Sequence, residues 1–74
     1  MNGTHSFEIA YRQDGLRLLL IRADRLSRSD AYAEICFAEH LLIGHKPPDP
    51  AMTFETLATS VGIELVYVRE IANL

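Results

Sequence analysis

Three histidines and one cysteine are the residues of this chain that could most directly do chemistry, as metal ligands or as a nucleophile. His40 and His45 are five positions apart with Gly44 between them, so one helical face would not present both. With His5 far away in sequence, no third ligand has the right spacing. Cys36 lies in an apolar stretch without a neighbouring base, which predicts a buried side chain rather than a reactive thiol. We therefore expect no metal, no cofactor, no small-molecule substrate and no enzymatic activity.

Arginine is the other residue type with a suggestive distribution. Formal net charge is −3, but residues 1–29 are basic whereas residues 30–74 are acidic. The guanidinium fork pairs well with phosphates and with carboxylates, so the arginines of the basic segment could contact phosphate or an acidic partner. These candidate residues are Arg12, Arg17, Arg22, Arg25 and Arg28.

The elements that must position these residues fit into one small domain, residues 1–74, with an N-terminal segment 1–29 and a helical core 30–74. The chain is 74 residues long and 49% hydrophobic. No apolar run approaches the ~20 residues of a membrane span, so we expect no membrane association. The start of the sequence lacks the features of a secretion signal, and one cysteine forms no internal disulfide. These observations favour a cytoplasmic protein, in a bacterium or a phage-infected host.

Helical patterning and caps predict three helices in the core, a mainly α fold. The first covers about 30–43, with Ser29 or Asp30 as its N-cap and Gly44 at its end. A proline-rich connection, residues 44–51, follows. Thr53 is the expected N-cap of the second helix, 54–60, and the third covers 64–73.

The segment before the core carries a strong turn signal, Asp14-Gly15, which predicts a β-hairpin over about 7–22. A two-residue turn at this dipeptide would pair Tyr11 with Leu18 and Ile9 with Leu20 on one face, leaving Leu19 and Ile21 on the second. The alternative is an extra N-terminal helix over 16–26, because the leucines there also follow helical spacing.

Residues 54–73 match the buried pattern of a helix-turn-helix: alanine at the fifth position, glycine at the ninth, valine at the fifteenth and isoleucine at the eighteenth. These are Ala58, Gly62, Val68 and Ile71. In this the segment resembles the helix-turn-helix transcription-regulator superfamily. The resemblance implies that the last helix would enter the major groove of DNA, with Arg69 and Asn73 as its DNA contacts.

The exposed positions of that helix favour a different partner. Two carboxylates, Glu64 and Glu70, would repel the phosphate backbone, and only Arg69 would oppose them. Apolar residues ringed by charge are typical of a protein-binding surface. The candidate partner-binding residues are Leu65, Val66, Tyr67, Arg69 and Glu70.

Together these features predict a non-enzymatic transcription regulator that acts mainly by protein contact, resembling small phage-type regulators that bind host RNA polymerase or another regulator. A DNA-binding helix-turn-helix repressor, acting as a dimer, is the first alternative. A structural or assembly protein is the second. The identity of the partner, any operator, the direction of regulation and the oligomeric state stay open at the level of sequence.

Overall fold

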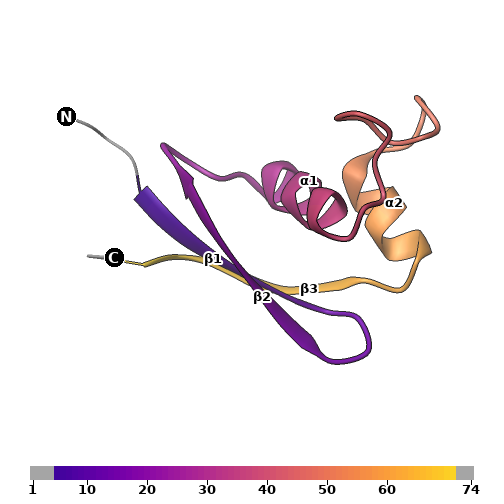
Figure 1. Ribbon diagram of the computed structural model, residues 1–74. Helices are drawn as coiled ribbons and strands as arrows, with labels where there is room; N and C mark the ends of the chain where they lie inside the picture. Colours follow the sequence, from indigo (N-terminus) through magenta and orange to yellow (C-terminus); the bar gives the residue numbers. More distant parts are fainter. Residues whose placement is uncertain (1–4, 72–74) are drawn as a thin grey trace.

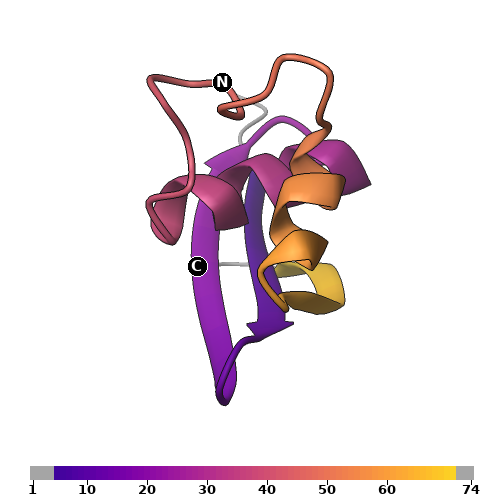
Figure 2. The same ribbon diagram turned by 90° about the vertical axis from the view of Figure 1, so that its right-hand side faces the viewer.

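The computed structural model describes residues 5–71 as a three-stranded antiparallel sheet with two helices on one of its faces. The elements are β1 (His5–Arg12), β2 (Leu16–Ala23), α1 (Arg28–Ala38), α2 (Phe54–Ser60) and β3 (Glu64–Ile71). The strand order is β2-β1-β3, so the first strand is the central one. Both helices lie on the same side of the sheet (Figures 1 and 2). The fold is α+β, and the predicted mainly α fold with three helices is wrong.

The N-terminal hairpin forms, but its register differs from the predicted one by a single residue. Arg12 pairs with Leu16 and Ile9 pairs with Leu19, so the connection has three residues rather than two. Asp14 and Gly15 both adopt positive φ, 55° and 123°. A one-residue slip moves every side chain of a strand to the opposite face of the sheet. Leu19 therefore shares a face with the buried Ile9, whereas the prediction placed it on the other side.

The alternative helix over 16–26 is also wrong, because most of that segment is β2. Leucine and arginine are good helix formers, but the hairpin lets this segment form a complete ladder with β1. Pairing with β1 therefore outweighs the helix propensity of these residues.

The predicted third helix, 64–73, is wrong, because the structure has strand β3 over residues 64–71. Its sequence, ELVYVREI, is rich in the β-branched and aromatic residues that pack well on a pleated surface. The strand pairs with β1, placing Val68 opposite Ile9 and Tyr67 opposite Ala10. A shift in register occurs between Ala10 and Tyr11, and the extra residue there is Val66. No DNA-binding helix exists at this position.

The two helices begin at side-chain caps. Helix α1 has a capping box in which the Ser27 hydroxyl accepts from the Asp30 amide and the Asp30 carboxylate accepts from the Ser27 amide. The helix therefore begins earlier than the predicted Ser29 or Asp30 cap allows, and it ends at Ala38, well before residue 43. Helix α2 has the predicted bounds, 54–60, and the predicted cap, Thr53, which accepts from the Thr56 amide.

The core lies between the helices and the inner face of the sheet. Its fully buried large side chains are Ile9 from β1 and Ile35 and Cys36 from α1. The remaining buried members of this cluster are Tyr11, Ala31, Tyr32, Leu57, Ala58 and Ile63. Val61, which follows α2, is exposed. The two helices thus cover one face of the sheet and leave the other to solvent.

Candidate functional site

The sheet face that points away from the helices is the candidate site, and we call it the open face. Cross-strand partners share a face, so the pairing register assigns each side chain to one side. Four rows cross the strands in the order β2, β1, β3. They are Leu16, Arg12 and Glu64; Leu18, Ala10 and Tyr67; Leu20, Glu8 and Arg69; and Arg22, Ser6 and Ile71.

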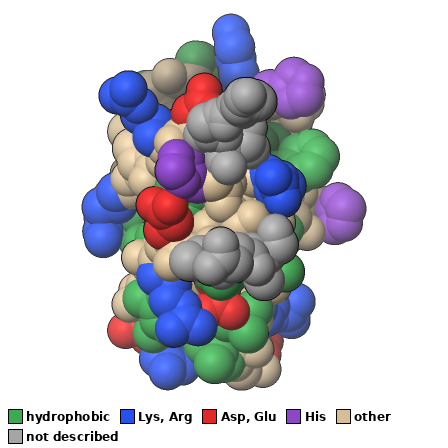
Figure 3. Space-filling view, turned by 90° about the vertical axis from the view of Figure 1, so that its left-hand side faces the viewer, with side chains coloured by type: hydrophobic (Ala, Val, Ile, Leu, Met, Phe, Trp, Pro, Cys, Tyr) green, Lys and Arg blue, Asp and Glu red, His purple; other side chains and the backbone are tan. Residues whose placement is uncertain are grey.

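Three leucines in alternate positions of β2 form an apolar column on the open face, which we call the leucine stripe. Leu16, Leu18 and Leu20 are 59%, 53% and 65% exposed. Single exposed apolar residues are common on protein surfaces, but a contiguous row of large ones marks an interaction site. Figure 3 shows the side of the molecule opposite to that in Figure 2, with hydrophobic side chains gathered in the lower part of the view among charged ones.

The neighbour of the stripe on the central strand is small. Ala10 lies between Leu18 on β2 and Tyr67 on β3, and it is fully buried although no helix covers this face. Ala10 is therefore screened from water by the longer side chains beside it. The surface at Ala10 is therefore lower than the leucine stripe on one side and the ring of Tyr67 on the other.

Among the described residues, the charged groups of the open face other than Arg22 are paired with one another. The Glu8 carboxylate accepts a hydrogen bond of 2.7 Å from the Tyr67 hydroxyl and one of 2.9 Å from Arg69 Nε. The Tyr67 hydrogen bond and the Arg69 charge lower the pKa of Glu8, although partial desolvation opposes them. The hydrogen bond to Glu8 correspondingly raises the pKa of Tyr67. In the first row, Arg12 Nη1 lies 2.9 Å from Glu64 Oε1.

The predicted partner-binding residues do not form one surface, because a strand sends successive side chains to opposite faces. Tyr67 and Arg69 lie on the open face. Leu65 packs against the core on the helix side. Glu70 is also on the helix side, where its Oε2 lies 2.7 Å from His5 Nδ1. Val66 occupies the irregularity in β3 and is partly exposed.

The predicted arginine group is likewise divided. Arg12 and Arg22 occupy opposite ends of the open face, six residues or roughly 20 Å apart along the strand direction. Arg28 lies near Glu55 of α2, with Nε 3.6 Å from Oε1, and Arg25 follows β2 in the connection to α1. Within residues 5–71, neither Arg22 nor Arg25 pairs with a carboxylate. No single basic patch results, and Asn73, the other predicted DNA contact, lies outside the described residues.

Arg17 takes part in a cluster on the helix side of the sheet. The Tyr11 hydroxyl donates a hydrogen bond of 2.6 Å to Glu39 Oε2, and Arg17 Nη1 lies 3.3 Å from the same oxygen. Desolvation, together with the adjacent Glu39 carboxylate, raises the pKa of Tyr11 to about 12. This cluster ties the end of α1 to the first two strands.

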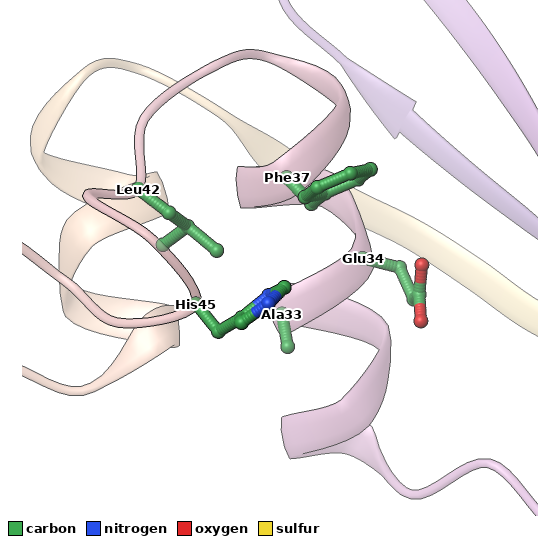
Figure 4. Close-up of a pocket in the computed structure, with 5 residues that line it drawn as sticks. All are labelled: Ala33, Glu34, Phe37, Leu42 and His45. Carbon is green, nitrogen blue, oxygen red and sulfur yellow. The ribbon is translucent and has the colours of Figure 1, made fainter.

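A second apolar surface lies on α1, away from the sheet. A hollow of about 320 Å³ is lined by Ala33, Glu34, Phe37, Leu42 and His45. Figure 4 shows these side chains around it, from the exposed side of α1 and from the connection that follows. The nearby Ile43 is 72% exposed and belongs to the same connection. The hollow is separate from the leucine stripe, because the sheet lies between them.

Across residues 5–71, no group of three or more His, Cys, Asp or Glu side chains is arranged to hold a metal ion. Cys36 is buried, its Sγ donates to the Phe54 carbonyl at 3.4 Å, and desolvation raises the pKa of its thiol. Neither α1 nor α2 is long and apolar enough to cross a membrane.

Sequence reasoning did not identify the leucine stripe as a site. The signal was present in the alternation of Leu16, Leu18 and Leu20, but the assumed two-residue turn placed Leu18 and Leu20 on the same face as Tyr11 and Ile9, which the structure shows to be buried. No family model, no curated protein and no solved structure matches this chain.

Proposed function

We propose that this chain is a non-enzymatic protein-binding module and that the leucine stripe is its contact surface. The observation that carries the proposal is the exposure of three neighbouring leucines on a face that neither helix covers. An apolar patch with a polar surround is the usual anatomy of a protein interface. The charged residues beside the stripe are compatible with this role, because Glu8, Arg69, Arg12 and Glu64 are already paired and need no new partner.

Contact with a protein partner was also predicted from the sequence, but there it was assigned to residues 65–70. The leucine stripe now takes the place of that surface. The narrower hypothesis, regulation of transcription through RNA polymerase or another regulator, drew on the resemblance of residues 54–73 to a helix-turn-helix. Since residues 64–71 form a strand, that resemblance no longer supports it. It stays a prediction, as does the cytoplasmic location.

The alternative of a DNA-binding repressor has less support. The element expected in the major groove is an edge strand bearing Glu64 and Glu70, and Arg69 is held by Glu8 at 2.9 Å. Binding of non-specific duplex DNA with a steep dependence on salt would favour this alternative over protein contact.

Site-specific photo-crosslinking tests the proposal. A photoreactive residue at position 18, in the stripe, is compared with one at position 43, an apolar position that is even more exposed and lies in the connection after α1. We expect protein adducts from position 18 that are absent from position 43. The adduct is then identified, and binding of the purified partner to Leu18→Arg and Ile43→Arg variants is measured. A loss of at least about tenfold in affinity for Leu18→Arg alone is expected; equal adducts, or equal affinities, would refute the proposal.

A further inference from the structure

We infer that the leucine stripe also binds a second copy of this chain, forming a two-fold dimer in which the open faces pack against each other. The inference rests on the proposed function, because it uses the same surface and specifies one partner for it. The order of the side chains in the four rows of the open face supports this dimer.

Consider a two-fold axis that lies between the sheets of the two copies and runs perpendicular to their strands. With this axis, the leucine stripe of one copy packs on the leucine stripe of the other. This axis superposes the second row of one copy on the third row of the other. Leu18 then faces Leu20 of the second copy, and Leu20 faces its Leu18. At each end, Arg22 faces Leu16 of the second copy, whose methyl groups can pack on the aliphatic part of the arginine while the guanidinium reaches water.

The same axis brings no like charges together. Arg12 faces Ser6 of the second copy, Glu8 faces its Ala10, and Arg69 faces its Tyr67. The last pair is a favourable one, since Arg69 already stacks on the Tyr67 ring of its own chain, with 5.4 Å between Cζ and the ring centroid.

An axis parallel to the strands is the main alternative, and it is unfavourable. It would place β1 on β1, so that Glu8 faces Glu8 and Arg12 faces Arg12 across the interface. It would also place the leucine stripe on the charged residues of β3, with Leu20 over Arg69. The like charges brought together on β1 make this arrangement unfavourable. The side-chain order therefore selects the antiparallel dimer.

The size of the face predicts a reversible association. Three strands of eight residues span roughly 14 Å by 27 Å, or about 400 Å² in projection. That is about half of the roughly 800 Å² that each partner contributes to a standard interface. We therefore expect dissociation in the micromolar range or above. Such a dimer covers the stripe in concentrated protein and releases it on dilution.

The test uses sedimentation equilibrium on the purified full chain from about 1 µM to about 500 µM. Wild type and Ile43→Arg should move from monomer towards dimer mass, and Leu18→Arg and Leu20→Glu should each stay monomeric. Because position 18 faces position 20 of the second copy, an equimolar mixture of Leu18→Arg and Leu20→Glu should recover the dimer. Circular dichroism verifies that each variant is folded, which the exposed positions of both leucines make the expected result.

Three results would overturn the inference: a wild-type chain that is monomeric throughout, a dimer insensitive to both substitutions, or a mixture that fails to recover association. In the parallel arrangement Leu20→Glu would face Arg69 and dimerise more strongly by itself, so that outcome would contradict the stated axis. The crosslinking described above keeps the two proposals distinct. If the chain sediments as a monomer and position 18 crosslinks only to other proteins, the dimer is refuted and the proposed function is not. If position 18 crosslinks only to a second copy of this chain, binding of other partners is refuted.

Discussion

Replacing Tyr11 with phenylalanine should destabilise the protein at neutral pH and do so progressively less as the solution becomes alkaline. The substitution keeps the buried ring but removes the hydroxyl that donates to Glu39 Oε2 at 2.6 Å. Near neutral pH the loss should be about 1–2 kcal/mol, because the hydrogen bond has a charged acceptor and Arg17 stays as a partner of Glu39.

The pH dependence follows from the raised pKa of Tyr11, about 12 in the folded protein against a reference value of 10.0. The folded state holds the phenolic proton more tightly than the unfolded state, so the hydroxyl stabilises the fold fully below pH 10. This contribution declines as the pH rises through 10 and is lost above about 12. At about pH 11, linkage gives a loss of about 1.4 kcal/mol.

The assay is urea unfolding of wild type and Tyr11→Phe at about pH 8 and about pH 11, with the free energy of unfolding extrapolated to water. The difference between the two proteins should shrink by about 1.4 kcal/mol at the higher pH. Because other groups titrate equally in both proteins, the comparison isolates Tyr11. A Glu39→Gln variant should show a weaker pH dependence, since the nearby charge is gone. A difference that is constant with pH would refute the assigned role of the hydroxyl.

Three further outcomes are expected. Ser27→Ala should lower the free energy of unfolding by about 1 kcal/mol through loss of the N-cap, and an unchanged urea midpoint would contradict the capping role. Tyr67→Phe should raise the pKa of Glu8 towards 4.5, as followed by carboxylate NMR, because the hydrogen bond from Tyr67 is the largest influence lowering it; an unmoved titration would show that Arg69 suffices. Finally, Cys36 should react slowly with a thiol reagent in the folded protein and rapidly in urea, and equal rates would disprove its burial.

Local signals predicted the local features of this fold. The Asp14-Gly15 dipeptide identified the hairpin, and Thr53 identified the start of α2, because a turn and a cap depend on residues within a few positions. Gly62 adopts the positive φ, 86°, that the pattern required. These features need no knowledge of distant parts of the chain.

The main wrong prediction, a helix in place of β3, concerns a feature that depends on contacts between residues far apart in the sequence. Residues 64–71 satisfy the apolar spacing of a helix, and what makes them a strand is the free edge of β1, far away in sequence. The leucine stripe was missed for a smaller reason. One additional residue in the hairpin connection reverses the two faces of β2, and nothing near Asp14-Gly15 distinguishes a two-residue from a three-residue connection clearly enough.

The position of β1 at the centre of the sheet has a consequence for the order of folding. Its contacts with β2 close a short loop, whereas its contacts with β3 join residues such as Glu8 and Tyr67, which are 59 positions apart. Closing that long loop loses more chain entropy and is the slower event. Until β3 docks, one edge of β1 exposes its backbone N–H and C=O groups, and the chain is then most prone to pair with another molecule. Substitutions that weaken β3 should therefore prolong this vulnerable interval during folding.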